Sequence, residues 1–155
     1  MKKFLLFTLF SLVVTFCKAQ DYTVRSAGQG KSGNYLVEVT VSSKKKLTSA
    51  AEDLVKEYAV RGVMFRGLMA SSGYGEQKPL IKDPSIEQTK ADFFKAFFNK
   101  GEYKRYASIV GSSLSTMKNK QTKMQETSAT VMVDKESLLH YLEESGIIQG
   151  FSNLW

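Results

Sequence analysis

Hydrophobic and polar residues alternate most clearly in the segment that begins at Tyr35. The apolar residues Tyr35, Val37, Val39 and Val41 are separated by residues that are mostly polar. Alternation with a period of two, rich in β-branched residues, is typical of a strand with one buried face. The sequence therefore predicts a strand over residues 35–42. Weaker patterns predict a short strand over 63–65 and two further strands over 103–110 and 123–133.

Three other segments repeat their apolar residues at helical spacing. The first runs from Leu47 to about Gly62. The second begins at Asp83, which is expected to cap it, and stops at Gly101. Its phenylalanines predict a wide aromatic face that packs on a sheet: Phe93, Phe94, Phe97 and Phe98. The third runs from the cap Asp134 to Gly146, with an apolar stripe of Leu138, Leu139 and Leu142.

The predicted order β-α-β-α-β-β-α favours an α+β fold. We expect a two-layer sandwich, with a mixed or antiparallel sheet of about four strands and three helices on one face. Residues 34–155 form one domain in this interpretation. The glycine-rich residues 20–33 are expected to be a flexible segment that leads into it.

One connection, from Gly67 to Asp83, is unusually long for a compact domain. Loops of this length are often functional, because recognition residues tend to sit on loops that a rigid scaffold positions. Four of its residues have no evident core role in the sequence pattern: Leu68, Met69, Tyr74 and Lys78. Together with the aromatic Trp155 near the end of the sequence, they are the candidate partner-binding residues.

The first nineteen residues have the pattern of a secretory signal peptide. Lys2 and Lys3 precede an apolar run from Phe4 to Phe16, and Ala19 supplies the small residue that cleavage before Gln20 requires. A retained anchor is one open alternative, although thirteen apolar residues are fewer than the ~20 that span a bilayer. A lipoprotein acylated at Cys17 is another, although the large Phe16 precedes that cysteine. We therefore expect a periplasmic, secreted or cell-surface protein with no transmembrane segment after cleavage.

Removal of the leader changes the composition that matters for function. It takes nineteen of the 155 residues and lowers the formal charge from +7 to +4, because it holds three lysines and no acid. So mild a basic excess does not indicate a nucleic-acid partner. The only cysteine also leaves, which excludes disulfides and cysteine chemistry from the mature chain.

The sequence predicts no catalytic residue, no metal ligand and no cofactor. His140 is the only histidine, and neither a serine nucleophile nor a metal site is built from one isolated imidazole. Paired carboxylates from separate elements would allow a glycosidase-like site, which the sequence alone neither shows nor excludes. Lysines at 44–46 and 118–123 offer contacts to an anionic surface.

Four segments of the chain resemble small exported α+β proteins of Bacteroidetes. They are AVRGVMFRG (Ala59–Gly67), QKPLI (Gln77–Ile81), ADFFKAFF (Ala91–Phe98) and YKRYASIVG (Tyr103–Gly111), and the leader ends in KAQ. The resemblance implies an envelope location and carries over no site residue.

The sequence as a whole favours an exported, non-enzymatic binding or assembly-accessory domain of the bacterial envelope. Its expected partner is an envelope protein or a surface glycan. A hydrolase of cell-wall or polysaccharide substrates and a binder of anionic surfaces are the alternatives.

Overall fold

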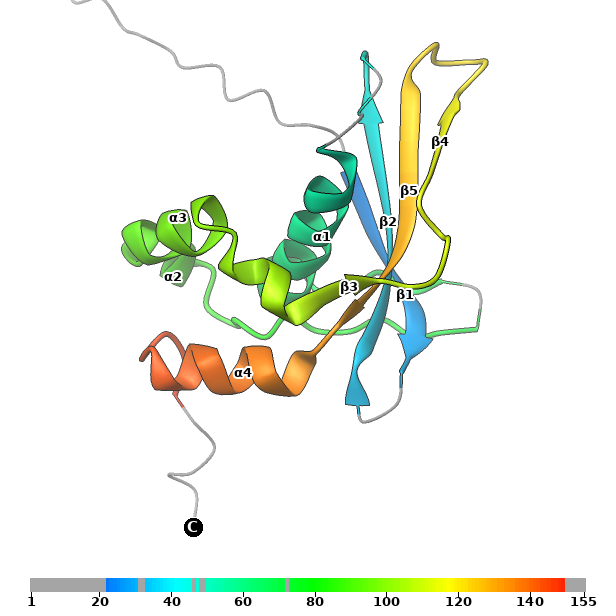
Figure 1. Ribbon diagram of the computed structural model, residues 1–155. Coiled ribbons are helices and arrows are strands. Elements are labelled where there is room, and N and C mark those ends of the chain that lie inside the picture. Colours follow the sequence, from blue (N-terminus) through cyan, green and yellow to red (C-terminus); the bar gives the residue numbers. More distant parts are fainter. Residues whose placement is uncertain (1–21, 31–32, 46, 48–49, 72, 150–155) are drawn as a thin grey trace, which may run out of the picture.

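The described residues form an antiparallel five-stranded sheet and four α-helices, which confirms the α+β class. The computed structural model describes residues 22–30, 33–45, 47, 50–71 and 73–149. The strands are β1 (Tyr22–Gln29), β2 (Tyr35–Ser43), β3 (Ala107–Ile109), β4 (Ser115–Lys118) and β5 (Gln125–Val133). The helices are α1 (Ala51–Arg61), α2 (Ser85–Thr89), α3 (Ala91–Asn99) and α4 (Lys135–Glu144). Figure 1 shows these helices on one side of the sheet.

The strand order is β1-β2-β5, with β3 and β4 both paired to the far edge of β5. Five residues lie between Ile109 and Ser115, whereas two lie between their partners Val131 and Ser128. The segment 107–118 is therefore one edge strand interrupted by three extra residues, and a bulge of this kind twists and blunts an edge.

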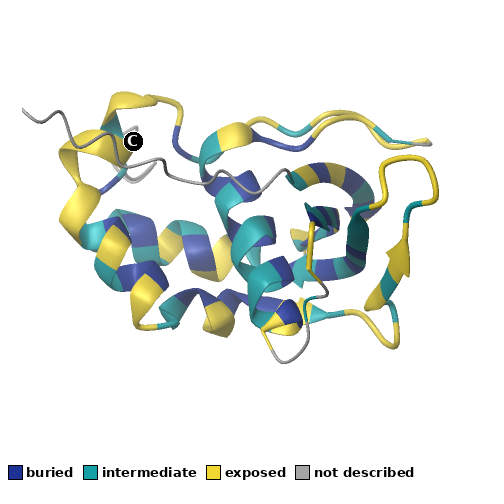
Figure 2. Cartoon of the chain, turned by 90° about the horizontal axis from the view of Figure 1, so that it is seen from above, coloured by how far each residue is buried: buried dark blue, intermediate teal, exposed yellow. Residues whose placement is uncertain are grey.

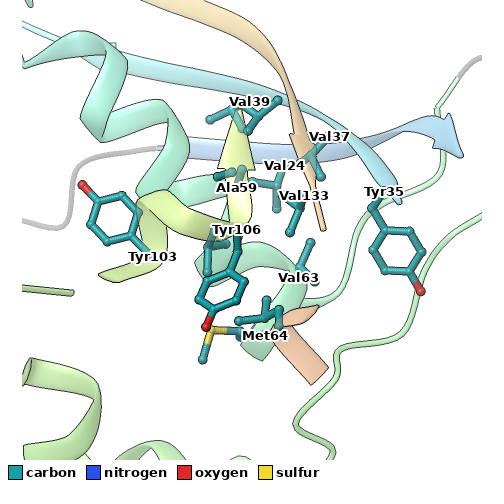
Figure 3. Close-up of a cluster of buried hydrophobic side chains, with 14 of the residues drawn as sticks. Val24, Tyr35, Val37, Val39, Ala59, Val63, Met64, Tyr103, Tyr106 and Val133 are labelled. Carbon is teal, nitrogen blue, oxygen red and sulfur yellow. The ribbon is translucent and has the colours of Figure 1, made fainter. Parts of the chain in front are cut away.

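The core lies between the sheet and α1. Alternate residues of the two central strands point toward this helix and are fully buried, among them Val37, Val39 and Val131. They meet Ala59, Val63 and other residues of the helical side (Figure 3). In Figure 2, buried and less buried residues alternate along the strands. This pattern confirms the half-buried strand predicted from the spacing of its valines.

A second, aromatic part of the core joins α3 and α4 to the 3₁₀ helix η3 (Glu102–Tyr106). The ring of Phe97 lies 5.6 Å from that of Tyr141 and 6.1 Å from that of Tyr106. Phe94, Phe97 and Phe98 are buried, so the predicted aromatic face exists. Its rings contact η3, α4 and Phe65, however, while α1 makes the principal helix contacts with the sheet.

The prediction of a flexible segment over residues 20–33 is wrong for Tyr22–Gln29, which form β1. The strand pairs with β2, and its inward positions Val24 and Ser26 are buried. Gly28, which a register shift places opposite Leu36, is buried as well. Small residues here indicate close packing. Gly28 has φ +118° and follows a register shift after Ser26, a conformation that favours glycine.

The short strand predicted over 63–65 is also wrong, because α1 continues into a π-helical turn, η2 (Gly62–Arg66). Gly67 closes this turn by donating its backbone N–H to the carbonyl of Gly62 at 2.8 Å. The carbonyls of Val63 and Met64 then accept from the N–H groups of Leu80 and Ile81. The end of the helix is thus satisfied by the returning loop instead of by a neighbouring strand.

Other boundaries differ in detail. The single helix predicted over 83–100 is divided at Lys90 into α2 and α3. Tyr103 and Tyr106, expected in a strand, point inward from η3 at a spacing of three residues. The cap Asp134 was predicted correctly, since it accepts a hydrogen bond from the N–H of Ser137 at 3.0 Å. Asp83 accepts from the N–H of Ser85 at 2.9 Å, but the N-cap of α2 is the next residue, Pro84.

Candidate functional site

The predicted recognition loop contains a hairpin along the edge of the sheet. The described residues of the segment 68–77, which are 68–71 and 73–77, form this hairpin. The N–H groups of Leu68 and Gln77 each donate to the other residue's carbonyl, at 2.8 and 2.9 Å. Nearer the tip, Ser71 and Tyr74 exchange backbone hydrogen bonds of 3.0 and 2.7 Å. The hairpin therefore has a defined backbone.

The 68–77 hairpin is fixed to β1. Ser26 donates its N–H to the carbonyl of Met69 at 2.8 Å, and Met69 donates to that of Val24 at 3.4 Å. Met69 lies beside Arg25 in a parallel bridge. The hairpin thus adds a short strand to the β1 edge and satisfies backbone groups that an edge strand would otherwise leave open.

The structure separates the predicted partner-binding residues into two kinds. Leu68 is only 3% exposed and belongs to the core, so its prediction as a partner-binding residue is wrong. Because strand residues alternate, its neighbour Met69 points the other way and is 51% exposed. Tyr74 is 50% exposed, and Lys78 is also exposed. Trp155 lies outside the described residues.

Tyr74 covers the backbone of Gly28. A Cβ atom at Gly28 would lie 2.9 Å from the Cε1 atom of the tyrosine ring, closer than packed atoms approach. An aromatic ring that packs over a glycine in an edge strand holds the strand register. Beside the ring is a recess of ≈ 320 Å³, which we call the Gly28 recess. It is lined only by uncharged residues: Ser26, Gly28, Gln29, Gly73, Tyr74, Gly75 and Gln77. Their hydroxyl, amide and backbone groups suit a neutral polar ligand.

The hairpin borders the sheet face that lies opposite α1, which we call the open face. Figure 1 shows no helix on this side of the sheet among the described residues. At its centre, Arg25 and Glu38 lie opposite each other on β1 and β2, and with Thr23 and Thr40 they line a recess of ≈ 180 Å³. Leu36 and Met132, paired across β2 and β5, are half-buried at the end of the face nearer Gly28. The open face therefore combines polar and apolar positions.

A larger groove of ≈ 580 Å³ lies between η3 and α4. It is lined by Arg105, Tyr106, Glu136, Ser137, His140, Tyr141 and Glu144. His140 Nδ1 lies 3.3 Å from Glu144 Oε2, but the side chains are 71% and 68% exposed. The Ser137 hydroxyl donates to Asp134 at 2.7 Å and not to the histidine. No nucleophile–base pair is therefore assembled in this groove.

The tyrosines of this groove are hydrogen-bond donors that stay protonated near neutral pH. Burial raises the pKa of Tyr141 to about 12, and its hydrogen bond to Glu102, 2.9 Å long, acts in the same direction. Burial also raises the pKa of Tyr106. Glu136 and Glu144 stand eight residues apart on one helix, a rise of about 12 Å. Their backbone positions are therefore farther apart than the roughly 5–9.5 Å that separates the two carboxyl groups of glycosidases.

The sheet register brings the two predicted lysine segments together at one end. Lys44 and Lys45 follow the last residue of β2, while Lys118, Lys120 and Lys123 lie at the end of β4 and in the turn to β5. All five are exposed. Lys46 is outside the described residues. Sequence spacing alone, with more than seventy residues between the segments, did not indicate this convergence.

Two classes of feature are not found in the described part of the chain. No three or more histidine, cysteine, aspartate or glutamate residues within it are grouped so that they could hold a metal ion. Its helices include none long and apolar enough to cross a membrane.

Sequence reasoning missed the Gly28 recess, because it assigned that glycine to a flexible segment. The signal that could have found the strand that carries it was the alternation of Tyr22 and Val24 with the polar Thr23 and Arg25. Comparison of the chain with protein-family models, with curated proteins and with solved structures finds no match. The resemblance to exported Bacteroidetes proteins therefore stays a prediction. The function is inferred from the geometry of the hairpin and the open face.

Proposed function

We propose that this chain is an exported, non-enzymatic binding domain of the bacterial envelope. In this proposal it recognises its partner through the 68–77 hairpin and the adjoining open face. The observation that carries the proposal is the exposure of Met69 and Tyr74, each about half exposed, on a hairpin that is hydrogen-bonded to the sheet. A rigid scaffold that holds apolar side chains exposed is one mark of an interaction surface.

The anchoring of the hairpin supports this role. Leu68 on one side and Ile81 just beyond the other are buried in the core, at 3% and 2% exposure. The side chains that face solvent are therefore presented by a backbone whose position is already fixed. A partner that binds this surface pays little additional cost for ordering it.

The chemistry of the surface favours an envelope protein as the partner. Methionine and tyrosine are enriched in the centres of protein interfaces, and the flexible thioether of Met69 adapts to irregular surfaces. The uncharged recess beside Tyr74 adds donors and acceptors that suit a peptide backbone. A surface glycan would use the same groups and is the alternative outcome.

Affinity capture from envelopes tests the proposal with a matched pair of substitutions. Met69→Ser removes the exposed side chain of the hairpin but leaves its backbone hydrogen bonds. Met117→Ser is the control, because Met117 is 70% exposed on β4, at the opposite edge of the sheet. The baits are exported proteins whose first residue, expected to be Gln20, is determined by sequencing.

Wild type and Met117→Ser should retain the same envelope protein, whereas Met69→Ser should lose at least tenfold of it, with an unchanged melting temperature. The loss corresponds to about 1.4 kcal/mol, the size of one moderately important interface residue. Equal capture by Met69→Ser and wild type would contradict the proposal. So would an intact leader on protein recovered from the cytosol.

A further inference from the structure

The five exposed lysines Lys44, Lys45, Lys118, Lys120 and Lys123 form a surface that we call the lysine end. Gln125, the first residue of β5, pairs with Ser43 on one side and with Lys118 on the other. Because adjacent strands lie about 4.8 Å apart, the end of β2 and the end of β4 are about 10 Å apart. The remaining lysines occupy the turns that continue from these strands.

Neighbouring acidic side chains neutralise little of the positive charge of the lysine end. None of its five lysines forms a salt bridge with a described residue. Two acids in the first turn of α1, Glu52 and Asp53, are paired with Lys56 and Lys104 at 2.6 and 2.7 Å. Glu126 on β5 accepts a hydrogen bond at 2.7 Å from Asn119, which carries no charge, and this one acid is outnumbered by the five lysines. The positive charge is therefore available to an external anionic partner.

We propose that the lysine end binds an anionic lipid membrane and so holds the domain at its surface. The lysines supply point charges, and the set contains no arginine, the residue that recognises a phosphate or carboxylate group in a bidentate manner. Such a set suits a surface of many headgroups better than one specific anion. Lysines near an anionic bilayer each contribute about fivefold to affinity.

Chain connectivity favours a membrane over a soluble anionic polymer. Tyr22, the first residue of β1, pairs with Val41 near the end of β2, so β1 begins at the lysine end. The apolar run of the leader ends at Phe16, six residues before Tyr22. While leader and domain are joined, the lysine end is therefore the part of the domain nearest to the membrane.

An apolar side chain accompanies the charges. Met117, 70% exposed, immediately precedes Lys118 on β4. Combined apolar burial and electrostatic attraction is the usual basis of peripheral membrane binding. The Gly28 recess and Tyr74 lie toward the other end of β1, so a membrane on the lysine end leaves them accessible.

Vesicle co-sedimentation of the exported protein tests this inference independently of the proposed partner. The vesicles are phosphatidylcholine with or without phosphatidylglycerol. The test variant changes all five lysines of the lysine end to glutamine. The control variant makes the same charge change at five exposed lysines elsewhere that form no salt bridge with a described residue: Lys78, Lys82, Lys90, Lys95 and Lys100.

Wild type and control should bind vesicles that contain phosphatidylglycerol, and rising salt should weaken the binding. Changing only Lys118, Lys120 and Lys123 should reduce the partition coefficient about a hundredfold, since each contributes about fivefold. The five-lysine variant should not sediment with the vesicles. Its melting temperature should match that of the control, because exposed substitutions have small effects.

Three results would overturn the inference: equal binding to neutral vesicles, equal losses in the test and control variants, or retention on immobilised dextran sulfate without vesicle binding. The last would assign the lysine end to an anionic polymer. Because the five-lysine test variant leaves Met69, Tyr74 and Lys78 unchanged, it should still capture the envelope protein even though it no longer binds vesicles. The two proposals can therefore fail separately.

Discussion

Gly62 shows how one residue sets the distance between α1 and the sheet. A Cβ atom placed there would come within 2.9–3.1 Å of three side-chain atoms of Val24 on β1. The φ of Gly62, −59°, is one that any residue adopts, so its role is close packing and not an unusual backbone conformation. Hydrophobic periodicity indicated only the end of a helix at this glycine, because a close contact with β1 leaves no trace in local spacing.

Gly62→Ala should destabilise the protein by about 1–3 kcal/mol, the usual cost of an overpacked core. Alanine is otherwise the better helix former, so propensity alone predicts the opposite sign. Gly75→Ala is the control, because a Cβ there meets nothing within 4 Å and φ is not in the left-handed region. Chemical denaturation measures both variants. A Gly62→Ala protein as stable as wild type would contradict the assigned packing.

At the scale of elements, the sequence predicted those whose burial follows a regular period and missed those defined by contacts. Strand β2 was predicted from the spacing of its valines, β5 from a weaker pattern, and the three principal helical segments from apolar spacing and caps. Strand β4 was missed, because Ser115–Lys118 has no buried residue and is held only by pairing with β5. The places of β1 and the 68–77 hairpin at the edge of the sheet were also missed. They depend on backbone hydrogen bonds, which leave no pattern in the sequence.

The contact of α4 with η3 makes stability depend on pH through Tyr141. Burial and the bond to Glu102 raise the pKa of Tyr141 to about 12 in the folded protein, whereas an unfolded chain has a value near 10. Between these values the unfolded chain loses the proton first, so stability present below pH 10 is lost as pH rises toward 12. Denaturation at a series of pH values should show a shallower decline for Tyr141→Phe. An unchanged slope would contradict this contribution.

At the scale of the whole molecule, the fold places the core, the exposed apolar groups and the positive charge in different parts of the domain. The helical side encloses the core, the open face and the 68–77 hairpin expose apolar groups, and the lysine end gathers positive charge. The sequence named the loop and both lysine segments as candidates. It assigned Leu68 to the surface wrongly, because a residue in a long irregular connection carries no periodicity that distinguishes core from solvent.

The position of the first strand fits the proposed export. Cleavage before Gln20 would leave β1 complete, since the described strand begins at Tyr22. The protein that reaches the envelope would then hold every described element. Recognition by the hairpin is the claim on which the functional account depends.

Site-specific photo-crosslinking in cells that naturally produce the protein tests that claim most directly. A photoreactive residue is placed at Met69, at His140 in the α4 groove, or at Met117 on the opposite sheet edge, each of which is exposed. Recognition by the hairpin should give one dominant adduct with an envelope protein from position 69 and little from positions 117 and 140. An adduct formed from position 140 alone, or none from position 69, would contradict recognition by the hairpin.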